Sequence, residues 1–476
     1  MLIDLSDVSP IANELFRAFK AAGGNALLVG GSVRDALCGK VAKDFDVEVY
    51  GLSAAAIEEI FRARQIRYNA AGRSFGVFKL HEAPLDVALP RRESKRGAGH
   101  AAFAVEGDPF MPIAEAARRR DFTVNAIYYD PLADEIFDPC GGRKDLERKV
   151  LRHVSPAFAE DPLRVLRAMQ FAARFRFDVA PETVELCKTI EPENLSRERI
   201  FAEWEKLLTK GEEPSRGLNF LRACGWVKYF PELEALIGCR QDPHWHPEGD
   251  VWNHTLKALD AFARERVASG DERADAEENL VVGLAVLCHD FGKPATTRRG
   301  KDGKIHAYGH DVAGVAPAKK FLLAMTENKK LIEEVLVLVE THMRPRALFT
   351  AKSGDAAVRR LAAKVGRLDR LLRVCKADAL GSSFHESEDF SETENWLNAR
   401  AAALAISSSA PVPIILGRHL LSLGIPAGRS FGAILHDCFE AQLDGAFSDE
   451  AGGLEFLKKI VAEKYSGAEE KGQGKC

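Results

Sequence analysis

The sequence predicts an α+β fold, in which an amino-terminal head with a small mixed β-sheet is followed by an all-α neck and body and then by a further all-α domain. Two patterns support this prediction. Residues 1–140 alternate between short apolar runs and turns, whereas strand patterns nearly vanish after Asp145. Because 46% of the 476 residues are hydrophobic, the chain has enough apolar side chains for about three domains with sizeable cores.

Short apolar runs in the first third of the chain predict four strands. They lie at residues 25–31, 44–51, 75–80 and 85–89. Helices are expected at residues 12–23 and 54–64, between these runs. Helices and strands that intermix in this way indicate a small sheet covered by helices.

The region after the sheet is predicted to be helical. Residues 161–175 place apolar side chains at helical spacing, with arginines between them. Further helices are expected at residues 181–190 and 196–209, and Ser196 is the expected amino-terminal cap of the second.

A break rich in His, Trp and Pro near residues 243–247 predicts the entry to another domain. The chain is therefore expected to have a head, a helical neck and body, a third helical domain, and a carboxy-terminal helical region with a disordered tail. The predicted boundaries are 1–145, 146–240, 241–390 and 391–476. The sequence gives no role for the last part beyond helical packing.

Composition excludes several classes of protein. The net charge of −4 argues against a wholly basic nucleic-acid binder. No apolar run reaches the length of about eighteen residues that a membrane span needs, and the first residues lack the pattern of a signal peptide. Nine cysteines, scattered without CxxC pairs, predict reduced thiols and a cytoplasmic location.

Basic residues nevertheless cluster at positions 91–96, 118–120 and 143–152. A single cluster of this kind is typical of a solvated surface. Three clusters in the same third of the chain as a pair of aspartates fit a track for a phosphate backbone better.

The stretch from Gly30 to Gly51 carries the first candidate site. Gly31 and Ser32 follow an expected strand, and exposed backbone N–H groups at such a turn suit a triphosphate. Arg34 adds a fork of donors for phosphate or ribose. Asp44 and Asp46 alternate along the next expected strand, so both carboxylates should point to one face and share Mg²⁺.

Bound metal ions at such a pair would activate an attacking hydroxyl and clamp a leaving pyrophosphate. Asp86, in a neighbouring apolar run, is either a third carboxylate near the metal ions or a residue at the end of a strand. A DxD pair alone is weak evidence for a metal site, but the combination with Gly-Gly-Ser at this spacing is far more specific.

Five motifs in a fixed order resemble a known family. GGSVRD and DFD are followed by RRRDFTVNAI at 118–127, DPCGGRKDL at 138–146 and HVSPAFAEDPLRVLRA at 153–168. In this order they resemble the class II tRNA nucleotidyltransferases, the CCA-adding enzymes, and the related bacterial poly(A) polymerases. The resemblance runs from about residue 26 to residue 240, and it implies transfer of CMP and AMP from CTP and ATP to the 3′ end of tRNA.

The resemblance also implies roles for individual residues in the head. Asp44 and Asp46 would bind the catalytic Mg²⁺ ions, and Gly31 and Arg34 would contact the incoming nucleotide. The family places contacts to ribose and phosphate in the segment Arg119, Arg120 and Asp121. Residues 91–105 match a flexible loop whose full length argues against an enzyme that adds only CC.

The neck carries the residues that the family uses to select the base. Asp161 and Arg164 match the pair that presents a Watson–Crick-like edge, so that the protein serves as its own template. Arg167 matches an arginine that contacts the nucleotide. Gln170 departs from the pattern, because many relatives carry another arginine there, and the exchange removes one charge from this helix face.

A second candidate site lies in the third predicted part. Seven of the thirteen histidines fall between His244 and His342, and they include the adjacent pair His289 and Asp290. Mixed imidazole and carboxylate ligands suit a transition metal that activates water. The pattern resembles the HD phosphohydrolase superfamily and the HD domain that is fused to some bacterial CCA-adding enzymes.

By this match the core ligands would be His254, His289, Asp290 and Asp378, with His310 and His342 as additional ligands. The metal would be a divalent transition ion such as Ni²⁺, Mn²⁺ or Co²⁺. A control lies in the same chain. The dipeptide His436-Asp437 has no histidine partners at the right spacing, so we interpret it as structural.

The leading hypothesis combines CCA addition by the head with 3′-end repair by the HD domain, which would act as a phosphatase and 2′,3′-cyclic phosphodiesterase. An A-adding enzyme and a poly(A) polymerase share nearly all the head motifs and remain alternatives. An RNA-binding HD phosphohydrolase with an inactive head is an alternative of another class. The expected partners are the tRNA 3′ end, CTP and ATP, with no membrane, and the chain is a monomer or a homodimer.

Overall fold

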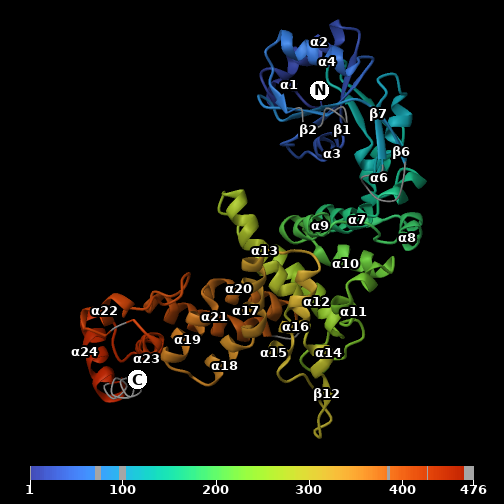
Figure 1. Ribbon diagram of the computed structural model, residues 1–476. Helices are drawn as coiled ribbons and strands as arrows, with labels where there is room; N and C mark the ends of the chain where they lie inside the picture. Colours follow the sequence, from blue (N-terminus) through green and yellow to red (C-terminus); the bar gives the residue numbers. More distant parts are fainter. Residues whose placement is uncertain (1, 70–76, 96–102, 383–385, 426, 466–476) are drawn as a thin grey trace, which may run out of the picture. The chain divides into compact units, whose positions relative to one another are not determined.

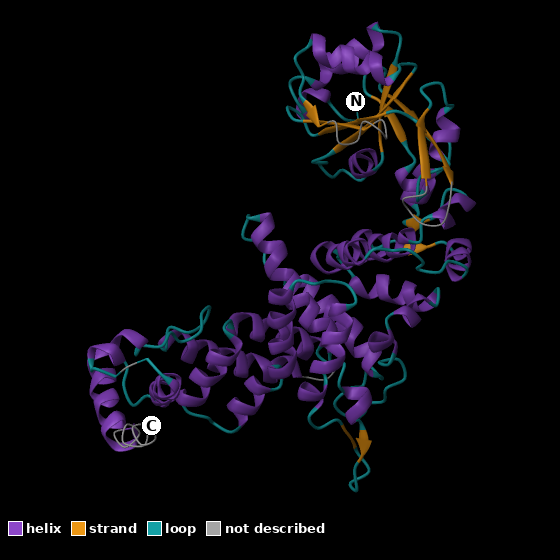
Figure 2. Ribbon diagram, viewed as in Figure 1, coloured by secondary structure: helices purple, strands orange, loops and turns teal. Residues whose placement is uncertain are grey.

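The computed structural model describes residues 2–69, 77–95, 103–382, 386–425 and 427–465. The chain divides into two compact units, Met1–Tyr229 and Phe230–Cys476 (Figure 1). The first unit holds a β-sheet and the helices that follow it, whereas the second is almost entirely helical (Figure 2). The α+β fold class is therefore confirmed, and the finer division into four parts stays a prediction.

The sheet of the first unit has seven strands in the order β3-β4-β5-β2-β1-β8-β9. Its strands are β1 (Asn25–Val29), β2 (Phe45–Tyr50), β3 (Tyr68–Asn69), β4 (Val77–Leu80), β5 (Leu85–Ala88), β8 (Tyr128–Asp130) and β9 (Glu135–Phe137). The sheet is mixed, because β2 pairs antiparallel with β1 and parallel with β5. All four strands expected from the sequence are present in it.

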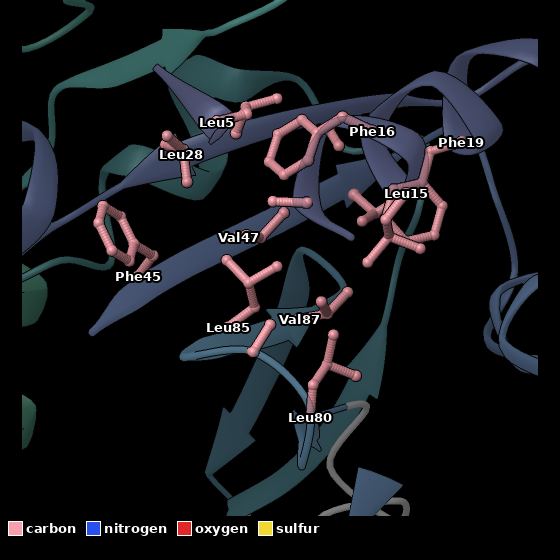
Figure 3. Close-up of a cluster of buried hydrophobic side chains, with 14 of the residues drawn as sticks. Leu5, Leu15, Phe16, Phe19, Leu28, Phe45, Val47, Leu80, Leu85 and Val87 are labelled. Carbon is pink, nitrogen blue, oxygen red and sulfur yellow. The ribbon is translucent and has the colours of Figure 1, made fainter. Parts of the chain in front are cut away.

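One face of this sheet is covered by helices and buries the main core of the first unit. Helices α1 (Leu5–Val8), α2 (Ala12–Ala21) and α4 (Ala54–Ala63) supply part of the apolar cluster. Figure 3 shows Phe16 of α2 close to Val47 of the sheet, and Phe19 beside Leu15 in the same cluster. Because side chains alternate along a strand, Phe45, Val47 and Val49 point into this core and the residues between them point to the other face.

The expected flexible loop at 91–105 overlaps residues 96–102, which lie outside the described part of the chain. The flanking segments β6 (Arg91–Lys95) and β7 (Phe103–Gly107) pair as an antiparallel ribbon. Helices α3 (Gly31–Leu37), α5 (Ile113–Ala117) and α6 (Gly142–Glu147) and the short η3 (Thr123–Asn125) complete the head.

The rest of the first unit is helical, as the sequence predicts. Its elements are β10 (Val150–Leu151), η4 (Pro156–Glu160), α7 (Leu163–Phe175), β11 (Asp178–Val179), α8 (Pro181–Lys188), α9 (Arg197–Lys210), α10 (Pro214–Ala223) and η5 (Trp226–Tyr229). The Ser196 side chain accepts a hydrogen bond from the Arg199 backbone N–H, which confirms the predicted cap of α9.

The second unit consists of helices and one short ribbon. The elements that build its candidate site are α12 (Val251–Arg264), α13 (Glu272–Cys288), α14 (Lys293–Thr296), β12 (Arg298–Arg299), β13 (Ile305–His306), α15 (His310–Ala313), α17 (Lys329–Thr341) and α20 (Leu368–Gly381). The remaining helices are α11 (Pro231–Glu234), α16 (Val315–Leu323), α18 (Arg344–Thr350), α19 (Asp355–Val365), α21 (Glu386–Ala403), α22 (Gly417–Ser422), α23 (Arg429–Asp444), α24 (Glu450–Ile460) and η6 (Val461–Tyr465).

The last helices of the second unit have a small apolar core of their own, which includes Leu420, Cys438 and Leu457. The predicted disordered tail, 466–476, lies outside the described residues. Among the helices that are described, none is both long enough and apolar enough to cross a membrane. The eight cysteines in the described segments carry free thiols.

Candidate functional site

The first candidate site lies on the face of the sheet opposite the main core. Asp46 on β2 is the direct neighbour of Asp86 on β5 in the parallel register. Neighbouring residues in register point to the same face, so the two carboxylates lie on one side. Asp86 therefore lies beside Asp46, and its role as a third carboxylate near the metal ions stays a prediction.

Asp44 does not lie on the strand, which corrects the expectation that it alternates with Asp46 along β2. The ladder begins only at Phe45, whose backbone N–H donates to Pro84 O at 2.9 Å. Asp44 therefore stands in the bend just before β2, exposed to solvent. Its carboxylate is within electrostatic range of Asp46 and raises the pKa of that group.

Gly30 forms a tight turn beside the side chains of Asp46 and Arg120. Its φ of +82° favours glycine, and a Cβ there would lie 3.0 Å from Asp46 Oδ2 and 3.2 Å from Arg120 Nη1. Arg120 Nη2 also lies 2.5 Å from Glu48 Oε1. The turn is thus a place where backbone, carboxylate and guanidinium approach closely.

Charge in this site is unbalanced. Burial raises the pKa of Asp46, and the carboxylates of Asp86, Glu48 and Asp44 add to this effect, while Arg120 opposes it. Carboxylate oxygens that repel one another on a sheet face that solvent reaches fit a hard divalent cation such as Mg²⁺. The donor set of the head is therefore compatible with the metal that the sequence predicts.

Arg34 and Ser32 are buried behind the turn. Arg34 Nη1 donates to Asn125 Oδ1 at 2.6 Å, and the guanidinium lies 4.2 Å from the centre of the Phe175 ring on α7. Ser32 Oγ donates to Val29 O at 3.4 Å. Gly31 is half-buried at the start of α3. Arg34 thus joins α3 to η3 and α7, a role that the sequence does not indicate.

Asp121 and Arg167, both predicted to contact nucleotide, contact each other. Arg167 Nε and Nη2 lie 2.8 and 2.7 Å from Asp121 Oδ2, while Asn125 Nδ2 donates to the other oxygen at 2.9 Å. Burial alone would raise the pKa of Asp121, but Arg167 and the hydrogen bonds hold this pKa below its usual range. The pair ties the head to α7.

The predicted base-selecting pair is held by partners that the sequence analysis missed. Arg199 Nη2 on α9 lies 2.9 Å from Asp161 Oδ2. Arg164 donates to the carbonyls of Ala157 and Arg119, at 2.8 and 2.7 Å. Both side chains are half-buried, so they are oriented by fixed contacts and keep an accessible edge.

Gln170, the departure from the family pattern, is 1% exposed and its Oε1 accepts no hydrogen bond in the structure. The position therefore lies inside the packing of α7, so the helix face from which the exchange removes a charge is buried here. An arginine at this position would need a buried partner.

The second candidate site brings together all six predicted ligands within the second unit. His254 comes from α12, His289 and Asp290 from the end of α13, and Asp378 from α20. His310 begins α15 and His342 follows α17. They form two groups whose ligand atoms lie within 4.8 Å of one another: His254, His289 and Asp378, and then Asp290, His310 and His342.

The imidazole rings present matching nitrogen atoms to the centre of the cluster. The Nδ1 atoms of His289, His310 and His342 lie 2.7, 2.8 and 2.7 Å from backbone carbonyl oxygens. Because a carbonyl oxygen can only accept, Nδ1 carries a proton in each ring, so Nε2 is the nitrogen that can bind a metal. The Nε2 atoms of His310 and His342 face each other at 3.1 Å, an arrangement that a shared cation would stabilise.

Burial and charge in the cluster also fit a metal. Neither oxygen of the buried Asp290 accepts a hydrogen bond of good geometry, although Lys293 Nζ lies 2.7 Å from Oδ2 as an ion pair. Burial and the neighbouring imidazoles lower the pKa of His342 to about 4. Burial would also lower the pKa of His289, but Asp290 and Asp378 raise it to about 10. Neutral imidazole and ionised carboxylate are the ligand forms that a transition metal needs, so metal binding would displace the second proton of the His289 ring.

Two residues beside the cluster were missed because they lie in the segment interpreted only as a domain entry. Glu248 Oε1, fully buried, lies 3.0 Å from His254 Nδ1 and 2.9 Å from His246 Nδ1. The opposite nitrogen of His254 lies 2.8 Å from Asp378 Oδ1. A carboxylate behind a ligating histidine orients the ring and raises its basicity.

A cavity of about 630 Å³ opens onto this cluster, a size typical of small-molecule sites. Its lining includes Asp290, His310, His342 and Asp378, together with the cations of Lys293 and Arg346. The control dipeptide lies elsewhere, on α23, where Asp437 pairs with Lys464 at 3.2 Å. Among the described residues, the groups that could hold a metal do not include it.

Two family models match the first unit. The poly A polymerase head domain matches residues 26–152, and the probable RNA and SrmB-binding site of polymerase A matches residues 176–237. Similar curated proteins are the multifunctional CCA proteins of Xylella fastidiosa and Nitrosococcus oceani. Each is 36% identical over 395 residues, which is 80% of this chain and 90% and 91% of those proteins.

Solved structures share the fold. The Bacillus stearothermophilus CCA-adding enzyme in complex with CTP aligns with a TM-score of 0.64 at 24% identity, covering 94% of this chain and 96% of that one. The Thermotoga maritima CCA-adding enzyme complexed with tRNA aligns with a TM-score of 0.56 at 20% identity, covering 96% and 99%. At these identities the likeness concerns the fold alone.

Proposed function

Because this chain belongs to the family of the multifunctional CCA proteins, which are CCA-adding tRNA nucleotidyltransferases, we propose that its first unit adds C, C and A to the 3′ end of tRNA. The nucleotides come from CTP and ATP, with release of pyrophosphate and without a nucleic-acid template. The single observation that carries this proposal is the placement of Asp46 and Asp86 side by side, against the Gly30 turn.

The residues of the head have distinct tasks in this reaction. Asp46 and Asp44, with Asp86 beside them, would hold Mg²⁺, which when bound lowers the pKa of the attacking hydroxyl and neutralises the leaving pyrophosphate. The absence of a side chain at Gly30 lets the triphosphate approach the backbone of the turn. Arg120, fixed by Glu48, supplies a guanidinium for phosphate or ribose.

Base selection is assigned to Asp161 and Arg164. An aspartate accepts and an arginine donates, so the pair can match the edges of C and A after a small side-chain movement. Arg199 sets the position of Asp161, and the carbonyls of Ala157 and Arg119 set that of Arg164. The helical part that follows would grip the RNA mainly through its backbone and shape.

The experiment that tests this proposal extends three tRNA transcripts, ending before CCA, after C and after CC, with CTP, ATP or both. Addition of CCA followed by arrest supports the proposal. Extension of the CC-ending transcript alone, by one A, would make the protein an A-adding enzyme. A long ladder of A would make it a poly(A) polymerase and would contradict the role of Asp161 and Arg164.

A second function is favoured by the buried cluster of the second unit. We propose that this cluster is the metal centre of an HD-type phosphohydrolase, which removes phosphates from RNA 3′ ends as a phosphatase and 2′,3′-cyclic phosphodiesterase. The ligands would be His254, His289, Asp290, Asp378, His310 and His342. A transition ion such as Ni²⁺, Mn²⁺ or Co²⁺ would, when bound, activate water for attack on phosphorus.

The surrounding residues prepare this attack. Glu248 orients His254 through Nδ1, and Lys293 offers a cation beside Asp290 for a substrate phosphate. Hydrolysis of 2′,3′-cyclic AMP by the full chain, measured with each metal in turn, tests the proposal. Absence of hydrolysis with all of them would refute it and would leave the proposal for the first unit untouched.

A further inference from the structure

The second unit carries a basic ribbon that neither proposed reaction uses. The ribbon is formed by β12 and β13, which pair Arg298 with His306 and Arg299 with Ile305. Figure 1 shows it projecting away from the helices of that unit. The basic ribbon comprises residues 298–306.

The ribbon concentrates positive charge on exposed positions. Its sequence is RRGKDGKIH, so four cations stand against one acidic residue. Arg298, Arg299, Lys301 and Lys304 are all exposed. Asp302 Oδ2 lies 2.9 Å from His306 Nε2, and Asp302 Oδ1 accepts a hydrogen bond from the Lys304 backbone N–H at 3.1 Å. The chain as a whole has a net charge of −4, which makes this local excess of cations stand out.

The arginines keep donors for a ligand. Arg298 Nη1 and Nη2 donate hydrogen bonds to the carbonyl oxygens of Thr297 and Ala295, and Arg299 Nε donates one to Gly303 O. These contacts are to backbone oxygens, which leave the guanidinium charge unneutralised. Asp242 at the base of the ribbon accepts a hydrogen bond from the Ile305 backbone N–H at 3.2 Å and offsets part of this charge. The four cations still exceed the nearby carboxylates, and an excess of positive charge on a protein surface attracts a polyanion.

Aromatic rings stand where the basic ribbon meets the cavity of the metal cluster. The rings of His306 and Tyr308 are stacked, with centres 4.9 Å apart and planes inclined by 12°. The Tyr308 side chain is 81% exposed, and Trp245, which lines the same cavity, is 41% exposed. Large aromatic side chains that stay open to solvent beside cations are typical of sites on which bases of a single strand stack.

The cavity connects these features to the metal cluster. Its lining includes Ile305, His306 and Tyr308 from the ribbon and its continuation, and also Asp290, His342 and Asp378 from the cluster. A strand whose phosphates follow the ribbon and whose terminal bases rest on the aromatic rings would therefore place its end in the cavity.

We propose that the basic ribbon, with Tyr308 and Trp245, is a binding site for the 3′-terminal single strand of an RNA, which it guides to the metal cluster. The site makes a polynucleotide end, and not a mononucleotide, the preferred substrate. This inference rests on the phosphohydrolase function proposed for the cluster.

Binding is measured first, because it does not depend on hydrolysis. The probe is a fluorescent single-stranded RNA of about twelve nucleotides with a 2′,3′-cyclic phosphate, since single-strand sites span about 4–16 nucleotides. The full chain is compared with the variant Arg298→Gln/Arg299→Gln/Lys301→Gln/Lys304→Gln. The matched control is Lys458→Gln/Lys459→Gln, which removes exposed charges from α24.

Each phosphate contact with a single strand contributes about 0.7 to the slope of log K against log salt. Loss of four contacts therefore lowers the slope by about 3, so that a fourfold rise in salt weakens wild-type binding about 50-fold more than binding by the variant. The control should keep the wild-type slope. Equal slopes for the wild type and the ribbon variant would overturn the proposal.

A local readout separates this site from RNA binding by the first unit. Trypsin cleaves after Arg and Lys, so the RNA should protect the ribbon from cleavage, whereas 2′,3′-cyclic AMP should not. Unchanged cleavage at saturating RNA would count against the proposal. The ratio of kcat/KM for the RNA to that for 2′,3′-cyclic AMP should also fall in the ribbon variant. If neither substrate is hydrolysed with any metal, the phosphohydrolase function fails, and the protection experiment still decides whether the ribbon binds RNA.

Discussion

The two candidate sites differ in how the fold supplies their charged groups. In the first unit, Asp46 and Asp86 stand on adjacent strands of a sheet face that solvent reaches. In the second, imidazoles and carboxylates from several helices meet in a buried cluster. A strand-borne site is set by local register, whereas a buried cluster depends on long-range packing and on complete compensation of charge. The two sites should therefore respond differently to substitution, metal and pH.

The largest expected effect is that substitution of one carboxylate in either site abolishes the activity of that site and leaves the other activity in place. Asp46→Asn should lower nucleotide addition by at least about 10³-fold and leave cyclic-phosphate hydrolysis in place. Asp290→Asn should do the reverse. Both rates are measured on the same preparations, with tRNA ending in CC and with 2′,3′-cyclic AMP.

The matched control is Asp437→Asn, which alters the second His-Asp dipeptide and should change neither rate. Because Asp290 is buried, Asp378→Asn serves as a second variant of the cluster. Loss of nucleotide addition in both cluster variants would mean that the two sites do not act independently.

The next effect concerns stability in the first unit. Arg167→Met leaves the Asp121 carboxylate buried without its cation, which should destabilise the contact between the head and α7 by about 3 kcal/mol at pH 7. Hydrogen exchange of the α7 amides reports this local loss. Protection equal to the wild type would show that Asn125 and the backbone suffice to hold the carboxylate.

The same pair predicts a pH dependence. The pKa of Asp121 is held below its usual range, so its contribution to stability is present above the unfolded value of about 3.9 and is lost as the pH falls through the folded value. The excess stability of the wild type over Asp121→Asn, followed by the same exchange experiment, should thus shrink as the pH falls below about 4. An excess that grew on acidification would contradict this sign.

A moderate effect is expected behind the buried cluster. Glu248→Ala should weaken transition-metal binding about 10- to 100-fold, because His254 loses the carboxylate that orients it. Glu248→Gln keeps an oxygen acceptor and should recover part of the affinity. Competition with a chelator measures both constants. If Glu248→Gln were as defective as Glu248→Ala, charge and not orientation would be the contribution of Glu248.

The sequence predicts local structure and residue types better than it predicts which side chains contact each other. The strands and helices of the first unit follow from short periodic patterns, and the six candidate ligands of the cluster follow from a spaced motif. Partners far apart in the chain do not, because a side chain's contacts depend on packing that no local pattern encodes. Asp121 meets Arg167, and Glu248 stands behind His254, for reasons visible only in three dimensions. The bend that removes Asp44 from β2 is likewise set by the first ladder hydrogen bond, to Pro84.

The smallest expected effect concerns Arg199, the partner of Asp161 that the sequence analysis missed. The ion pair is partly exposed, with about a quarter of each side chain open to solvent, so its net contribution is at most about 1 kcal/mol. Arg199→Ala should therefore lower the preference between CTP and ATP no more than about fivefold. Arg199→Lys keeps the charge but loses the planar guanidinium fork, so its preference between CTP and ATP should lie between those of the wild type and Arg199→Ala. The fraction of wrong nucleotide added to transcripts ending before CCA and after CC measures this preference. A loss of all addition in Arg199→Ala would place Arg199 on the substrate itself, whereas a small loss of selectivity at an unchanged rate is what a side chain that only orients Asp161 should produce.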